Sequence, residues 1–72
     1  MSELQLKIQD LEYTVADLKK ELRRIKTTIN KVEKLGLSIP SELLFKKEEV
    51  ESILKERKEE LKALKKVVKL IK

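Results

Sequence analysis

The sequence predicts an all-α protein in which two long helices fold back on each other as an antiparallel coiled-coil hairpin. Three observations support this fold. Charged residues make up 43% of the chain and aromatic residues 3%, which is typical of long helices and coiled coils. Apolar residues recur at alternating steps of four and three. The only glycine and the only proline, Gly36 and Pro40, lie four positions apart near the middle of the 72 residues.

The first helix is predicted over about residues 2–35. A heptad pattern runs through this segment without a polar interruption, and Ile8 is taken as its first a position. The a positions are then Ile8, Val15, Leu22 and Ile29, and the d positions are Leu4, Leu11, Leu18, Ile25 and Val32. Such a repeat, sustained for about four heptads, indicates a coiled-coil seam.

The second helix is predicted over about residues 40–71 and carries a looser version of the same seam. Its apolar members are Leu43, Val50, Leu54, Leu61, Leu64, Val68 and Ile71. Lys47 and Arg57 occupy the two remaining seam positions, where long stems can pack while the charge reaches solvent. We expect Leu18, Leu22, Ile25 and Leu61 to be among the most buried side chains.

Residues 36–39 are predicted to form the turn. Gly36 suits the left-handed position after a helix, with Leu37 folding back as its apolar partner. Pro40 suits the first turn of the next helix, and Ser38 or Ser41 can cap it. A short connection of this kind makes the two helices antiparallel neighbours.

A later start of the second helix is the alternative. Phe45 and Val50 have the spacing of a hydrophobic staple, with Glu49 at the third helical position, so the helix could begin near Lys46. The earlier start is favoured because it gives two helices of about equal length, roughly 50 Å each.

The charges change sign in blocks along the chain. Residues 1–18 carry a net charge of −3, residues 19–36 of +5, residues 42–60 of −2 and residues 61–72 of +5. An antiparallel hairpin sets each block beside one of opposite sign. Because exposed ion pairs stabilise by only a few tenths of a kcal/mol, this arrangement selects orientation more than it stabilises.

A single seam between two helices buries little apolar surface, so we expect a second contact surface. Five apolar residues lie off the seam: Leu6, Tyr13, Ile53, Val67 and Leu70. The prediction is a homodimer in which two hairpins pair into a four-helix bundle. The alternative is that these residues are ordinary scattered apolar surface.

The sequence gives no indication of catalysis. It contains no Cys and no His, which removes thiolate chemistry, the usual acid–base group and the commonest zinc ligand. The carboxylates are interspersed with lysines, as on a solvated helix face. We therefore expect a protein that is not an enzyme and has no cofactor, no metal site and no catalytic residues.

A spaced set of cations lies on the outer side of the first helix, away from the seam: Lys20, Arg23, Arg24, Lys31 and Lys34. Cations at such spacing can follow phosphates. The sequence thus favours a non-enzymatic interaction module that binds itself and an unidentified protein partner through helix faces. The alternative is a non-specific nucleic-acid-binding protein that uses these basic faces.

The chain shows neither an apolar leader nor an apolar run long enough to span a membrane, so a cytoplasmic protein is expected. The last twelve residues are amphipathic and cationic like a membrane-surface helix, but their apolar face continues the seam, which favours packing. Abundant Lys and Glu with scarce Asn and Gln is typical both of hyperthermophile proteins and of designed helical proteins.

Overall fold

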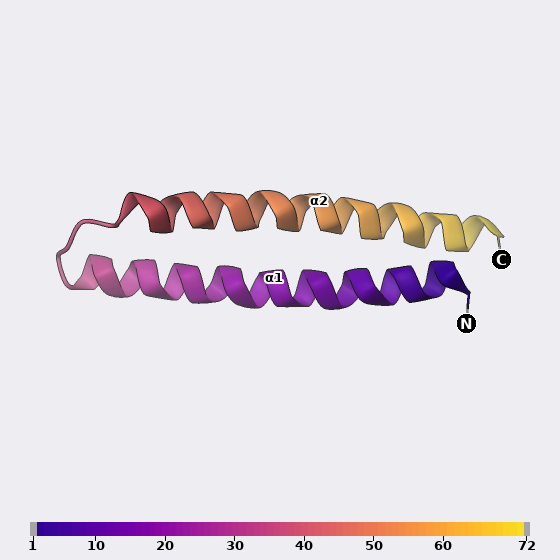
Figure 1. The fold of residues 1–72 in the computed structure, drawn as a ribbon, viewed down its shortest axis with the longest axis horizontal. Helices are drawn as coiled ribbons and strands as arrows, with labels where there is room; N and C mark the ends of the chain where they lie inside the picture. Colours follow the sequence, from indigo (N-terminus) through magenta and orange to yellow (C-terminus); the bar gives the residue numbers. More distant parts are fainter. Residues whose placement is uncertain (1, 72) are drawn as a thin grey trace.

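The computed structural model describes residues 2–71 as two helices, α1 (Glu3–Lys34) and α2 (Ser41–Ile71). The helices run antiparallel side by side, and both ends of the chain lie at the same end of the molecule (Figure 1). The hairpin measures 55 × 16 × 15 Å. The predicted all-α helical hairpin is confirmed. We call the two ends of the molecule the turn end and the open end.

Helix α1 is closed at both ends by local hydrogen bonds. Ser2 Oγ accepts from the Gln5 backbone N–H at 3.2 Å, and the Ser2 backbone N–H donates to Gln5 Oε1 at 3.5 Å, which forms a capping box. At the other end, Gly36 has φ of +73°. Its N–H donates to the Glu33 carbonyl at 2.9 Å, and the Leu37 N–H donates to the Val32 carbonyl at 3.2 Å. These two bonds define the Schellman motif expected around Gly36.

Helix α2 begins at Ser41, so the alternative start near Lys46 is wrong. The Pro40 carbonyl accepts from the N–H groups of Leu43 at 3.0 Å and Leu44 at 3.3 Å. Pro40 therefore sits at the N-cap position, one residue before the first turn in which it was expected. Within the described residues, the side chains of Ser38 and Ser41 make no capping hydrogen bond, because the proline already occupies the capping position.

Six apolar side chains of the described chain are buried: Leu11, Val15, Ile25, Ile29, Val50 and Leu54. Ile25, Ile29 and Val50 form a connected cluster, and Leu18, Leu22, Ile39 and Leu43 pack against it. The burial expected for Ile25 is confirmed. The burial expected for Leu18, Leu22 and Leu61 is wrong, because these three are only half-buried.

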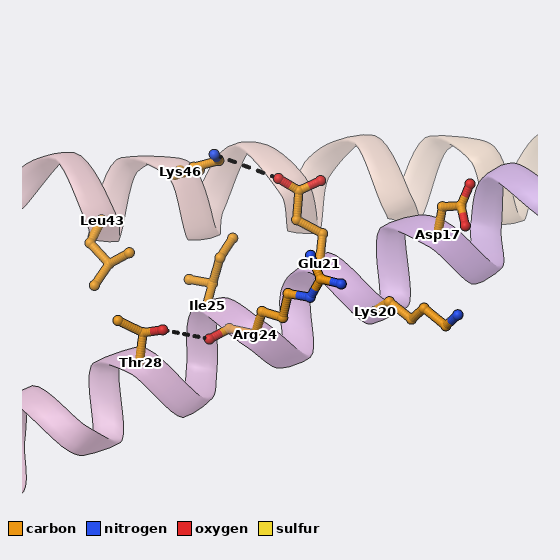
Figure 2. A pocket seen from close by; sticks show the side chains of 8 residues that line it. All are labelled: Asp17, Lys20, Glu21, Arg24, Ile25, Thr28, Leu43 and Lys46. Atoms are coloured by element: carbon orange, nitrogen blue, oxygen red, sulfur yellow. Dashed lines mark hydrogen bonds and ion pairs between the residues drawn. The ribbon is translucent and has the colours of Figure 1, made fainter.

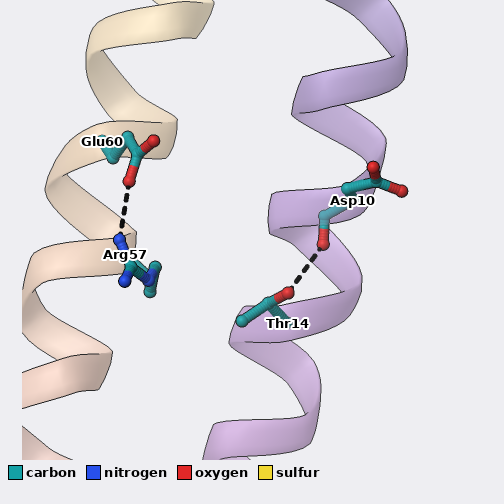
Figure 3. A network of polar contacts seen from close by, with 4 residues as sticks. All are labelled: Asp10, Thr14, Arg57 and Glu60. Carbon is teal, nitrogen blue, oxygen red and sulfur yellow. Dashed lines mark hydrogen bonds and ion pairs between the residues drawn. The ribbon is translucent and has the colours of Figure 1, made fainter.

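The partial exposure of the seam has two physical causes. One seam between two helices leaves its sides uncovered, so a leucine facing either edge stays accessible. In addition, a register that packs Ile25 near Val50 sets Leu18, seven residues earlier, opposite Arg57, seven residues later. Arg57 directs its guanidinium Nη1 to Glu60 Oε2 at 2.9 Å, within α2 (Figure 3).

Candidate interaction surfaces

The hairpin has two long edges along which the seam is open to solvent. In the heptad numbering, Glu21 and Lys46 occupy g positions on one edge, whereas Lys19 and Lys58 occupy e positions on the other. Each edge carries a shallow groove between the two helices. The two grooves differ in the charge of their walls.

The first groove has walls of mixed charge, and we call it the mixed-charge groove (Figure 2). It is lined by Asp17, Lys20, Glu21, Arg24, Ile25, Thr28, Leu43 and Lys46. Ile25 and Leu43 lie between the two helices and form its apolar floor. Acids and bases alternate around that floor, so no single sign of charge is presented to a ligand.

One salt bridge crosses between the helices in the described part of the chain, and it lies in the mixed-charge groove. Lys46 Nζ is 3.6 Å from Glu21 Oε1, with the two side chains 61% and 46% exposed. Glu21 belongs to the basic block of α1 and Lys46 to the acidic block of α2. The pair therefore runs against the block pattern. Charge blocks of opposite sign lie side by side on the two helices, but the described residues form no further ion pair between the helices.

The second groove has only basic and apolar walls, and we call it the lysine groove. It is lined by Val15, Lys19, Lys58, Leu61, Lys62, Lys65, Lys66 and Lys69. Towards the turn end it continues into a depression lined by Leu22, Glu51, Leu54, Lys55 and Lys58. Lys58 borders both depressions, so they are neighbours along this edge of the hairpin, the first with Val15 and Leu61 and the second with Leu22 and Leu54 in its lining.

The predicted nucleic-acid contacts gather on α1. Lys20, Arg23, Arg24 and Lys31 line one shallow depression together with Thr27 and Thr28, whereas Lys34 does not line it. All five predicted cations are exposed. The two threonine hydroxyls are already engaged. Thr27 Oγ1 donates to the Arg23 carbonyl and Thr28 Oγ1 to the Arg24 carbonyl, each at 2.9 Å. The hydrogen-bond donors that this depression offers are therefore those of the four cations.

The predicted self-association residues fall into two places. Leu6, Tyr13, Val67 and Leu70 are exposed at the open end, while Ile53 lies in the middle of α2 and is half-buried. Leu6 and Tyr13 share the f position of the heptad, which points away from α2. The structure thus collects four of the five residues at one end of the hairpin without bringing Ile53 to them.

Two surfaces escaped the sequence reasoning. Leu35, Leu37, Leu44 and Phe45 are all exposed at the turn end. Leu37 was expected to fold back on α1, but only its backbone closes the cap. The lysine groove was also not predicted, because the block pattern sets residues 61–72 beside the acidic block of residues 1–18. The signal was present: from Lys58 onward, α2 carries lysine at e and b positions on the edge that also holds Lys19.

The described residues contain neither a cluster suited to a metal ion nor a helix suited to span a membrane. Across residues 2–71, acidic side chains gather nowhere in a set of three or more able to hold a metal ion. Neither described helix combines the length and apolarity of a membrane span. Comparison with protein-family models, with curated proteins and with solved structures finds no match to the chain.

Proposed function

We propose that this chain is a non-enzymatic helical interaction module that self-associates and binds a protein partner through its helix faces. The observation that carries the proposal is the excess of accessible surface. The hairpin exposes 6035 Å² for a mass of 8.5 kDa, whereas a compact monomer of that mass exposes about 4,700 Å². The excess is larger than the roughly 800 Å² per partner that a standard protein interface covers.

The excess surface includes exposed apolar side chains at both ends. In the described part of the chain, nine large apolar residues are exposed: Leu6, Tyr13, Leu35, Leu37, Leu44, Phe45, Val67, Leu70 and Ile71. Apolar surface gathered in this way marks an interaction site more often than scattered single residues do. Two hairpins that pair into a four-helix bundle would cover apolar surface that a single hairpin leaves exposed.

Sedimentation equilibrium of the full chain tests self-association. We expect a dimer of twice the 8.5 kDa chain mass at micromolar concentration, with a Tm that rises with protein concentration because mass action stabilises the associated form. A monomer mass at every concentration, with a constant Tm, would contradict the proposal.

A pair of matched variants locates the interface. Tyr13→Glu introduces a charge at an open-end side chain that is 65% exposed, and Phe45→Glu does the same at a turn-end side chain that is 69% exposed. We expect Tyr13→Glu to weaken dimerisation at least tenfold and Phe45→Glu to leave it nearly unchanged. The opposite result would move the interface to the turn end.

Non-specific binding of nucleic acid is the second candidate function. It is supported by the depression in which Lys20, Arg23, Arg24 and Lys31 meet without an acidic neighbour in its lining. Contacts of this kind go to phosphates, so affinity should fall steeply with salt and should not depend on base sequence. Reversal of Arg23 and Arg24 to Glu should abolish binding while helicity is kept. An absence of a mobility shift with both single- and double-stranded probes at physiological salt would exclude this candidate.

A further inference from the structure

We propose that the lysine groove is the docking site for an acidic amphipathic helix of a partner protein. The inference rests on the proposed function, in which a helix face binds a protein, and it names the face and the chemistry of the partner. The groove offers an apolar floor, cationic walls and the shape of a cleft between two helices, and each of these restricts the occupant.

The apolar floor of the groove favours apolar side chains on the partner helix. Within the groove, Val15 is recessed, with 7% of its surface exposed, and Leu61 is half-buried. In the adjoining depression towards the turn end, Leu54 is recessed, with 6% of its surface exposed, and Leu22 is half-buried. A third helix laid along this edge would remove the apolar surface that the groove exposes from water. Its apolar residues would recur at i, i+3, i+4 and i+7, as in other helix-in-groove complexes.

The cationic walls of the groove favour acidic side chains on the partner helix. Six lysines line the groove, Lys19 from α1 and five more from α2, and no acid lines it with them. Without a ligand, these like charges repel one another across a shared depression. Glu and Asp flanking the apolar stripe of a third helix would neutralise them, and such complementarity selects the partner and speeds association.

The dimensions of the groove match about three helical turns. Its α2 lysines extend from Lys58 to Lys69, a helical rise of about 16 Å at 1.5 Å per residue. An occupant of about eleven residues in helical form would therefore reach every lysine. Glu51, beyond the groove on the side of the turn end, would repel further acids and sets a limit to the acidic stretch.

Other anionic partners satisfy only part of this arrangement. A phosphodiester backbone matches the lysines but offers no aliphatic group for the floor. A bilayer surface is flat, whereas Val15 lies recessed between the helices. An amphipathic helix satisfies the floor and the walls together, which is why the observations favour it.

A synthetic peptide tests the proposal on the full chain. The probe is a fluorescent helical peptide with Leu at a and d positions and Glu at most others, and its comparator has the same composition in scrambled order. Fluorescence anisotropy should give micromolar binding of the probe that weakens as salt is raised. The scrambled peptide should bind at least tenfold more weakly, because it lacks the apolar stripe.

Charge-reversed variants assign the binding to the groove. Lys62→Glu with Lys69→Glu changes two groove lysines at exposed positions off the seam, and Lys31→Glu with Lys34→Glu makes the same change of net charge outside the groove. The groove variant should lose at least tenfold in affinity and the control less than twofold. Circular dichroism should show unchanged helicity in both variants.

Several outcomes would overturn the inference. These are equal binding by the groove variant, equal binding of the scrambled peptide, and tighter binding of duplex DNA or phosphatidylserine vesicles than of the probe. If the groove variant instead becomes monomeric while the control stays dimeric, the groove is filled by a second copy and the inference also fails. Sedimentation of the same samples separates the two proposals. If the wild-type chain is a dimer that does not bind the peptide, only this inference is contradicted. If the wild-type chain is a monomer that binds the peptide, only self-association is contradicted.

Discussion

The two halves of the hairpin are built from the same repeat, yet they are packed differently. Near the turn, Ile25, Ile29 and Val50 form a connected buried cluster to which both helices contribute. Towards the open end, α1 still buries Leu11 and Val15, but no described residue of α2 beyond Leu54 is buried. The exposed apolar residues of the last helical turns, such as Leu70, lie in this looser half.

The difference in packing implies a difference in local stability between the two halves. The turn half has a covalent connection, a closed cap at Gly36 and the packing of Ile39 and Leu43 against the cluster. The open half has Arg57 in its seam and two chain ends that no turn joins. Regions with few buried apolar contacts open most easily. The lysine groove and the open-end residues belong to this looser half.

The largest effect should come from truncating the turn-half cluster. Ile25→Ala should lower the free energy of unfolding by about 2–5 kcal/mol, because a buried side chain is lost from a connected core. Leu64→Ala, at a half-buried seam position of the open half, should cost about 1 kcal/mol, because less buried surface is lost. Urea unfolding followed by circular dichroism measures both. Equal losses would show that the two halves are packed alike.

The cap at the turn comes next. Gly36→Val should destabilise the hairpin by about 1 kcal/mol or more, because a β-branched residue is strained at φ of +73°. A Cβ at this position would meet no atom within 4 Å, so the cost is conformational rather than steric. Gly36→Asn is the control, since asparagine tolerates this conformation better, and it should recover part of the loss. Thermal unfolding that ranks Asn below Val would contradict this account.

The fold could be predicted because one regular repeat and one pair of helix breakers determine it. The seam from Leu4 to Val32 and the breakers Gly36 and Pro40 fix two helices and their turn. Detailed burial could not be predicted in the same way. A heptad pattern indicates which residues face the other helix. It does not indicate how much of each seam side chain stays exposed along the uncovered sides of the seam. Leu22 and Leu61 follow the pattern and are still half-buried.

The candidate surfaces were harder to predict because they depend on both helices at once. The cations of α1 follow one another in a single helix, so their gathering was visible in the sequence. The lysine groove joins Lys19 to lysines some forty or more residues later, and only the register of the hairpin brings them to one edge. The salt bridge from Glu21 to Lys46 depends on the same register.

A substitution at Arg57 should make the two halves more alike. Arg57→Leu would place an apolar side chain opposite Leu18 and extend the cluster towards the open end, raising the free energy of unfolding by about 1 kcal/mol. The lost pair with Glu60 offsets little of this gain, since its side chains are 42% and 37% exposed. Lys55→Leu, at an exposed position off the seam, is the matched control and should change stability less. If Arg57→Leu destabilises the hairpin, Leu18 and residue 57 do not face each other.

The smallest expected effect on stability comes from the Glu21–Lys46 ion pair, which joins the two helices in the turn half. A double-mutant cycle with Glu21→Gln and Lys46→Gln should give a coupling free energy of a few tenths of a kcal/mol, because both side chains are about half-exposed and solvent screens their attraction. The coupling should vanish at about 1 M salt, where the screening length falls to about 3 Å.

The same cycle on Arg57 and Glu60, which pair within α2, provides the comparison in the open half. The Glu21–Lys46 coupling requires the two helices to be paired, so it should be lost under any condition that separates them. The Arg57–Glu60 coupling needs only a helical turn and should survive in any state in which α2 remains helical. If both couplings disappear together, the two halves unfold as one unit despite their different packing.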